Sequence, residues 1–253
     1  MRRHLLLLSL LLMIAACGDP EAEVGEGMLE ITDGTTYSGH PSVGYMMVGS
    51  AMCTATLVGK KMVLTAAHCI HTGMSHVFHV AGGTYVADAV APHPSWNSQT
   101  LMNDIALVRL KAAPNVTPSI VSQHAPTPGL KLTLVGYGKT SSYKEDAGLK
   151  RIAYNSVYQV NSTRFTFAGT GGGIGNTCKG DSGGPAFATL GGREVQVGVT
   201  SAGATPCGKM GVDTRVDAFY TWLLNNSGGD LYGGPAQDKP PPLVAITYPA
   251  DGA

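Results

Sequence analysis

The chain has 253 residues, of which 43% are apolar and 13% are charged, a composition typical of one sizeable globular domain with short appendages and not of a disordered chain. Its 17 basic and 17 acidic residues balance, which argues against recognition of nucleic acid or of an anionic membrane surface by net charge. The 34 glycines and 15 prolines are spread among short apolar runs, a distribution that favours a loop-rich β protein.

The first residues have the pattern of an export signal. Two arginines precede an apolar run over residues 5–14, which suits a signal peptide and is too short for a stable membrane span. The run ends at Ile14-Ala15-Ala16-Cys17, which resembles the lipobox of bacterial lipoproteins, where the cysteine is acylated and becomes the mature N-terminus. We therefore expect a signal peptide over residues 1–16 and a lipid anchor on Cys17. An ordinary cleaved signal with an incidental thiol is the alternative.

Polar segments flank the body of the chain. Residues 17–30 carry several acidic side chains and few apolar ones, which predicts a solvated tether or pro-segment. Residues 227–242 are rich in Gly and Pro and are interpreted as a linker. Residues 243–253 then alternate like one strand. They either begin a truncated immunoglobulin-like module or form a frayed tail, since a lone strand cannot fold by itself.

Residues 31–226 form the body, in which short runs rich in Val, Ile, Leu, Thr and Tyr are separated by turn residues. This pattern predicts antiparallel strands, and it leaves open whether they form a sandwich or a barrel. The expected strands include residues 55–66, 105–110, 131–136 and 194–200. One helix is expected over residues 216–226, with Val216, Phe219, Tyr220, Leu223 and Leu224 on one face.

Three segments carry the residue types of nucleophilic catalysis. His68 follows a buried strand, Asp104 precedes one, and Ser182 lies in a glycine-rich loop. A serine hydroxyl is a weak nucleophile, so a histidine must remove its proton, while an aspartate fixes the tautomer of that histidine. Taken singly, the three residues are equally a core histidine, a strand-capping aspartate and a turn serine.

Taken together, the stretches 64–69, 103–107 and 180–185 resemble the signature blocks of the trypsin/chymotrypsin-like serine proteases, and the likeness spans about residues 31–226. The resemblance implies an all-β fold of two six-stranded antiparallel Greek-key β-barrels with a C-terminal helix and an active site in the cleft between the barrels. It implies His68, Asp104 and Ser182 as the catalytic triad, with the backbone N–H groups of Gly180 and Ser182 forming the oxyanion hole.

The same resemblance assigns two disulfides, Cys53–Cys69 beside the histidine and Cys178–Cys207 between the serine loop and the pocket wall, and an exported protein can keep both oxidised. A zinc site is the competing interpretation, but these cysteines lack Cys-x-x-Cys spacing. We expect no cofactor and no metal. The remaining histidines considered as ligands are interpreted as solvent-facing: His71, His76, His79 and His93.

Ile31 resembles the N-terminus that this family creates by proteolysis, whose ammonium inserts beside the aspartate before the nucleophile. That aspartate is Asp181 in this chain. A buried carboxylate there needs a charged partner, so we expect a zymogen that is cleaved before Ile31. The preceding residue is Glu30 and not the Lys or Arg of trypsins, which argues against self-activation by a trypsin-like cut.

The pocket floor of the family lies six residues before the serine, where this chain has Asn176 in place of the aspartate of trypsins. A preference for Arg or Lys is therefore not implied. Asp213 is either a surface or hydrogen-bonded carboxylate or supplies the negative charge that Asn176 lacks. The other positions that match the pocket are Ser201, Gly203 and Gly211, with Ala202 replacing a frequent tryptophan.

The predicted function is that of a serine endopeptidase acting on proteins or peptides, exported as a monomer, anchored by lipid at the bacterial cell envelope and releasable from it. We expect no nucleic-acid partner. Two alternatives use the same residues: a catalytically silent binding protein of the same fold, and an esterase or acyltransferase with the same nucleophile.

Overall fold

The computed structural model describes residues 31–32, 34–169 and 174–233. The predictions for the signal peptide, the acidic tether with Cys17, the strand over residues 243–253 and all but the start of the linker lie outside the described residues. Within the described part of the chain, no helix is both long and apolar enough to cross a membrane.

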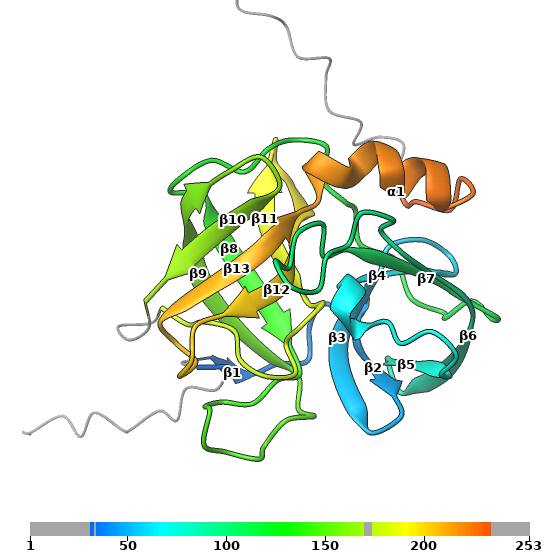
Figure 1. The fold of residues 1–253 in the computed structure, drawn as a ribbon, viewed down its shortest axis with the longest axis horizontal. Helices are drawn as coiled ribbons and strands as arrows, with labels where there is room; N and C mark the ends of the chain where they lie inside the picture. The colour runs from blue at the N-terminus through cyan, green and yellow to red at the C-terminus, as the bar shows by residue number, and fades with distance from the viewer. Residues whose placement is uncertain (1–30, 33, 170–173, 234–253) are drawn as a thin grey trace, which may run out of the picture.

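The first half of the body folds into a closed antiparallel barrel with the strand order β2-β3-β4-β7-β6-β5 (Figure 1). Its strands alternate buried and partly exposed side chains where one face meets the barrel interior, as in the pattern of β5. The strands are β2 (Val43–Val48), β3 (Ala51–Leu57), β4 (Met62–Thr65), β5 (His76–Val80), β6 (Gly83–Pro92) and β7 (Ala106–Leu110).

The second half forms another barrel, in which β8 and β9 pair and so close the order β9-β10-β13-β12-β11-β8. The two-residue strand β1 (Thr35–Thr36) adds to its outside by pairing with β9. The barrel strands are β8 (Lys131–Gly136), β9 (Arg151–Val160), β10 (Arg164–Ala168), β11 (Pro185–Leu190), β12 (Arg193–Gly203) and β13 (Met210–Arg215).

After the last strand, a helical segment lies over the first barrel (Figure 1). A 3-10 turn, η2 (Asp217–Phe219), leads into α1 (Tyr220–Asn226). Phe219 and Leu223 join the core of the first barrel, although they follow the last strand of the second. The helical segment therefore connects the last strand of the second barrel to the core of the first. The prediction that Leu224 shares the buried face is wrong, since its side chain is 46% exposed.

The predicted fold class is confirmed: all β, two six-stranded antiparallel barrels and a C-terminal helix. The expected strand over residues 55–66 is instead the end of β3, a turn and β4, because Gly59 and Lys60 allow the chain to reverse. Packed structure also continues past residue 226, where the Asp230 carboxylate accepts hydrogen bonds from the backbone N–H groups of Lys60 (2.7 Å) and Lys61 (2.8 Å).

The expectation of solvent-facing histidines is wrong for His76. His76 is the first residue of β5, and its side chain faces the barrel interior and is only 3% exposed. Its Nε2 accepts a hydrogen bond from the backbone N–H of His71 at 3.3 Å. Burial lowers the pKa of His76, because desolvation disfavours the charged imidazolium. His76 is thus a neutral core residue of the first barrel.

Candidate active site

An aspartate and a histidine from the first barrel form the best-defined pair of the site. His68 lies in the short 3-10 helix η1 (Ala67–Cys69), directly after β4. Asp104 precedes β7 and follows Asn103, whose left-handed φ of 58° turns the chain inward. The Asp104 carboxylate accepts hydrogen bonds from the His68 backbone N–H at 2.9 Å and pairs with His68 Nδ1 at 2.7 Å. Both the position and the ring orientation of the histidine are therefore determined by one carboxylate.

The second barrel holds Asp104 from its other side. The Ser201 hydroxyl donates to Asp104 Oδ2 at 2.6 Å, and the Thr214 hydroxyl donates to the Asp104 carbonyl at 2.9 Å. The Asp104 side chain is fully buried, so these hydrogen bonds replace the water that a carboxylate would otherwise require.

Ser182 enters from the second barrel on the loop between β10 and β11. Its carbonyl accepts a hydrogen bond from the Thr54 backbone N–H at 2.9 Å, which ties the loop to β3. Gly183 has a left-handed φ of 79° and packs so closely on Thr65 that a Cβ would overlap the threonine hydroxyl. The serine is thus placed at the seam between the barrels, where only glycine fits beside it.

The backbone N–H groups of Gly180 and Ser182 donate to no other described residue. Gly180 has a φ of 98°, and its carbonyl is turned away to accept a hydrogen bond from the Thr54 hydroxyl at 2.9 Å. Two free N–H donors next to a serine are the components of an oxyanion hole. No hydrogen bond joins the Ser182 hydroxyl to His68 within the described residues, a link that in free enzymes often tightens only when substrate binds.

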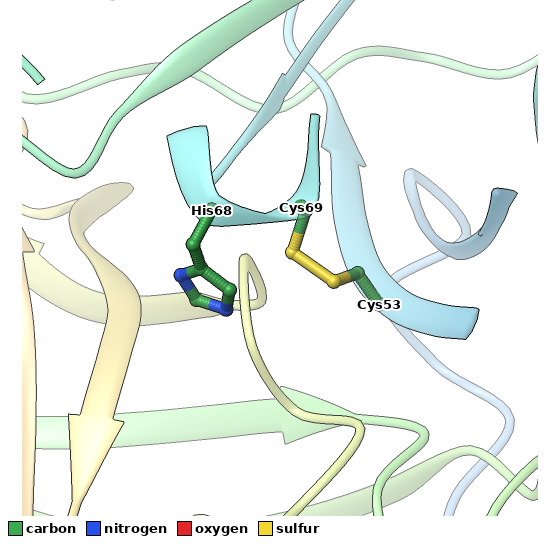
Figure 2. Close-up of side chains that lie close together, drawn as sticks. All are labelled: Cys53, His68 and Cys69. Carbon is green, nitrogen blue, oxygen red and sulfur yellow. A yellow bond between two sulfur atoms is a disulfide. The ribbon is translucent and has the colours of Figure 1, made fainter. Parts of the chain in front are cut away.

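Figure 2 shows Cys53, His68 and Cys69 lying close together, with the two cysteines joined by a disulfide. Their potential ligand atoms all lie within 4.8 Å of one another, which is compact enough for a metal ion. Each sulfur is already bonded to the other, however, so neither is the thiolate that a metal requires. The group is a disulfide that anchors η1 to β3 beside the histidine.

The second disulfide, Cys178–Cys207, bounds a pocket of about 120 Å³ beside Ser182. Both disulfides inferred from the resemblance are therefore present. Of the predicted pocket positions, Gly203 lines this hollow, and Ser201 does not, because its hydroxyl is directed to Asp104. The remaining wall is made by Thr177, Lys179, Thr200, Ala202, Ala204 and Thr205.

Asn176 and Asp213 lie behind this wall with fully buried side chains. The Asn176 Oδ1 accepts a hydrogen bond from the Thr177 backbone N–H at 2.9 Å, and a Cβ on Gly211 would approach the same oxygen to 2.9 Å. Asn176, Gly211 and Asp213 are thus not among the residues that line the hollow, and their assignment to the specificity pocket stays a prediction.

Asp213 is a buried carboxyl group with unusually few partners. Thr200 lies close enough to favour the charged form slightly, yet neither carboxyl oxygen has a well-formed hydrogen bond to a described residue. Burial accordingly raises the pKa of Asp213 to about 8. At neutral pH the group is mostly a neutral acid.

Asp181, directly before the serine, is also buried but is well supported. Its carboxylate accepts hydrogen bonds from the backbone N–H groups of Gly138 at 2.8 Å and Cys178 at 2.9 Å. Burial raises the pKa of Asp181 to about 6, against these two hydrogen bonds and the positive charge of Arg151, which lower it. Asp181 is therefore mostly charged at neutral pH, although its pKa of about 6 lies close to neutrality.

The segment that begins at Ile31 is docked into the second barrel. The Ile31 side chain belongs to the barrel core, and Thr32 and Asn176 exchange two hydrogen bonds of 3.0 Å, one through the threonine hydroxyl and one between backbone groups. No hydrogen bond or ion pair joins Ile31 to Asp181 among the described residues.

Three residues that support the site were missed from the sequence. Thr54 connects the serine loop to β3, and its hydroxyl also accepts a hydrogen bond from the Tyr137 backbone N–H at 3.1 Å. Thr214 holds the Asp104 backbone, and Arg151 lies buried near Asp181. Threonines in strands are common, so only the charge of Arg151 inside a strand pattern was a usable signal.

Comparison with known proteins gives consistent results. A family model described as Trypsin matches residues 31–223. Trypsin alpha-4 of Lucilia cuprina is 30% identical over 237 residues, which cover 81% of this chain and 92% of that protein. Chymotrypsin-like elastase family member 1 of Bos taurus is 30% identical over 206 residues, covering 68% and 77%. Among solved structures, neuropsin, a serine protease expressed in the limbic system of mouse brain, matches with a TM-score of 0.68 and 25% identity over 77% of this chain and 98% of that chain.

Proposed function

Because the chain belongs to the trypsin family of serine proteases, we propose that it is a serine endopeptidase that hydrolyses peptide bonds through an acyl-enzyme on Ser182. The observation that carries the proposal is the His68–Asp104 pair at 2.7 Å, facing a serine loop whose Gly180 and Ser182 N–H groups have no described partner. The pair supplies the base, and the two N–H groups supply the anion site.

In the proposed reaction, His68 takes the proton of the Ser182 hydroxyl as its oxygen attacks the substrate carbonyl, and later gives a proton to the leaving amine. Asp104 stabilises the imidazolium that forms between these steps. The Gly180 and Ser182 N–H groups hold the developing oxyanion, and each such donor contributes roughly 3 to 4 kcal/mol of transition-state stabilisation. Water then hydrolyses the acyl-enzyme by the same steps.

The proposed specificity pocket is the hollow beside Ser182, whose walls include Gly203 and Thr200. Burial favours the neutral form of Asp213. If Asp213 supplies the negative charge that Asn176 lacks, a positively charged substrate side chain that enters the pocket must cause Asp213 to lose its proton. Support for this hypothesis is the position of Asp213 next to Thr200, across β12 and β13. If Asp213→Asn left cleavage after Arg and Lys unchanged, the hypothesis would be wrong.

Activation by cleavage before Ile31 is also part of the proposal. The buried Ile31 side chain and the Thr32–Asn176 hydrogen bonds support a docked position for a new N-terminus, whose ammonium would be the partner of Asp181. N-terminal sequencing of active protein should begin at Ile31. Full activity in protein still joined to the residues before Ile31 would overturn this part.

Export and membrane attachment are proposed from the lipobox resemblance of Ile14-Ala15-Ala16-Cys17, and the two disulfides are consistent with secretion. Expression in a bacterium that acylates lipoproteins should give a membrane-bound protein, and Cys17→Ala should release it. Incorporation of labelled palmitate into wild type but not into Cys17→Ala would identify the anchor.

The central test is covalent labelling of purified protein, cleaved before Ile31, with a fluorophosphonate, followed by assays on peptide and ester substrates. We expect labelling of wild type, none of Ser182→Ala, and turnover of peptides. A folded wild type that resists labelling would favour the silent binding protein. Labelling with ester turnover alone would favour the esterase or acyltransferase.

A further inference from the structure

The loop between β8 and β9 contacts the serine loop and the pocket wall. The Lys139 backbone N–H donates to the Lys179 carbonyl at 2.8 Å, and the Cys207 backbone N–H donates to the Ser142 hydroxyl at 2.9 Å. The Gly138 N–H donates to the Asp181 carboxylate. The conformation of this loop is therefore transmitted to both sides of the candidate site.

The backbone at the end of β8 sets the place of the Asp181 carboxylate. A Cβ on Gly136 would overlap one carboxylate oxygen, and a Cβ on Gly138 would lie 2.5 Å from the other. The carboxylate thus lies flat against two glycines, and a small displacement of Gly138 would displace Asp181 and the loop that follows it. Contacts that fix the position of Gly138 therefore also fix the position of the Gly180 and Ser182 N–H groups.

A single buried guanidinium closes the β8–β9 loop from inside. Arg151, at the start of β9, is 1% exposed, and it donates to the carbonyls of Gly138 and Asp146, each at 3.0 Å, and more weakly to that of Leu149. Its charge lies 3.8 Å from the Asp146 carboxylate. That carboxylate also accepts hydrogen bonds from the Thr140 N–H at 3.0 Å and hydroxyl at 2.6 Å.

We propose that Arg151 is a positioning residue for the oxyanion hole: it fixes the Gly138 backbone, Gly138 holds the Asp181 carboxylate, and Asp181 sets the loop that carries the Gly180 and Ser182 N–H groups. The inference rests on the proposed function of that loop. An arginine suits the task because its planar fork donates in several fixed directions at once, which a lysine ammonium cannot do.

Arg151 also acts on Asp181 through its charge. Among the described residues, Arg151 on β9 is the charged group that acts on the Asp181 pKa, while Lys139 in the β8–β9 loop and Lys179 in the serine loop meet through a backbone hydrogen bond. In the activated enzyme, the proposed Ile31 ammonium would be a further positive partner of Asp181. The Arg151 guanidinium lowers the pKa of the buried Asp181 carboxyl. Loss of that charge should therefore leave Asp181 protonated at a higher pH, where the acid no longer accepts both N–H groups.

The test measures the rate at which a fluorophosphonate acylates Ser182, as a function of pH, in the complete activated enzyme. The variants are Arg151→Met, which removes the fork and the charge, and Arg151→Lys, which keeps the charge. Arg109→Met is the matched control, because Arg109 is an exposed arginine paired with Asp88 on the first barrel. Thermal unfolding of each variant reports whether it is folded.

For Arg151→Met we expect a rate about tenfold or more below wild type at pH 7 and an acid limb displaced upward by about one pH unit. For Arg151→Lys we expect a similar loss of rate with an unmoved acid limb, and for Arg109→Met no change. Folded Arg151→Met with the wild-type rate and limb would overturn the proposal. If Arg151→Met does not fold, Arg151→Lys decides: a wild-type rate overturns the proposal and a reduced rate supports it. A wild type that is not labelled at all would instead count against the proposed function.

Discussion

The two barrels hold their halves of the site by different means. The first barrel supplies His68 and Asp104 from an interior that is largely apolar, and Asp104, the one buried carboxylate among its described residues, is hydrogen-bonded on every side. The second barrel supplies Ser182, and it buries ionisable groups around the serine loop: Arg151, Asp181 and Asp213. Hydrogen bonds to one buried carboxylate therefore fix the proposed base, His68, whereas several buried ionisable groups surround the loop of the proposed nucleophile, Ser182. Sensitivity to pH and to single substitutions should concentrate in the second barrel.

The largest expected effect nevertheless lies in the first barrel, on the chemistry itself. Asp104→Asn replaces the group that accepts from His68 Nδ1, so the histidine is held in the wrong tautomer. We expect the acylation rate to fall about 10⁴-fold with little change in thermal unfolding, since an amide can keep several of the hydrogen bonds. Ser201→Ala, which removes only one donor to Asp104, is the control and should cost far less. Equal losses in the two variants would show that Asp104 acts only as a structural anchor.

The seam between the barrels should be the next most sensitive point. Gly183→Ala places a methyl group against the Thr65 hydroxyl in a backbone conformation with a φ of 79°. We expect a loss of about 3 kcal/mol in the free energy of unfolding, measured by urea denaturation, together with a large fall in acylation rate. Gly192→Ala is a matched control, because Gly192 has a φ of 77° with nothing within 4 Å. Its cost should be about 1 kcal/mol. If the two variants lost the same free energy of unfolding, the close approach of Gly183 to Thr65 would contribute nothing to the cost of the substitution.

Asp213 offers a direct test of buried charge in the second barrel. Its pKa of about 8 lies above the ordinary value of 3.8, so between these pH values the folded state retains a proton that the unfolded state has lost. Stability should therefore fall as pH rises through this window, and the loss is complete above pH 8. Between pH 6 and 8, above the pKa of Asp181, we expect wild type to lose on the order of 2 kcal/mol and Asp213→Asn to lose less. Parallel urea midpoints for the two proteins over this range would contradict the assignment.

The residues proposed to carry out the chemistry could be picked out from the sequence because they stand in short, contiguous blocks. Alternating strands predict an all-β body, and the blocks around His68, Asp104 and Ser182 carry the resemblance that implies two barrels. The disulfides follow from the same resemblance. These features depend on local sequence, so they survive without knowledge of the tertiary contacts.

The features that could not be predicted depend on how side chains from distant parts of the chain pack against one another. The sequence left open whether Asp213 is a pocket residue or a surface or hydrogen-bonded carboxylate, and the structure buries its side chain completely, next to Thr200. Arg151 was not singled out from the sequence, and its burial arises because β1 and the β8–β9 loop cover it. His76 similarly faces inward because it opens the interior side of β5. Such outcomes are set by tertiary packing and not by local pattern.

The smallest expected effect concerns the C-terminal segment, which was interpreted as linker from residue 227 onward but packs against the first barrel. The Asp230 carboxylate accepts the backbone N–H groups of Lys60 and Lys61, and the Tyr232 N–H donates to the Val58 carbonyl at 2.8 Å. Asp230→Ala leaves two turn N–H groups without their acceptor, and water satisfies them only in part. We therefore expect a loss of about 1 kcal/mol in the free energy of unfolding, with an unchanged acylation rate. Asp88→Ala, which breaks an exposed pair with Arg109 on the same barrel, should have no measurable effect, because exposed ion pairs contribute little. Equal urea midpoints for Asp230→Ala and Asp88→Ala would mean that the Asp230 hydrogen bonds add no stability to the first barrel. A lower midpoint for Asp230→Ala alone would extend the folded domain to this segment and add a second carboxylate, after Asp104, that stabilises the first barrel by binding backbone N–H groups.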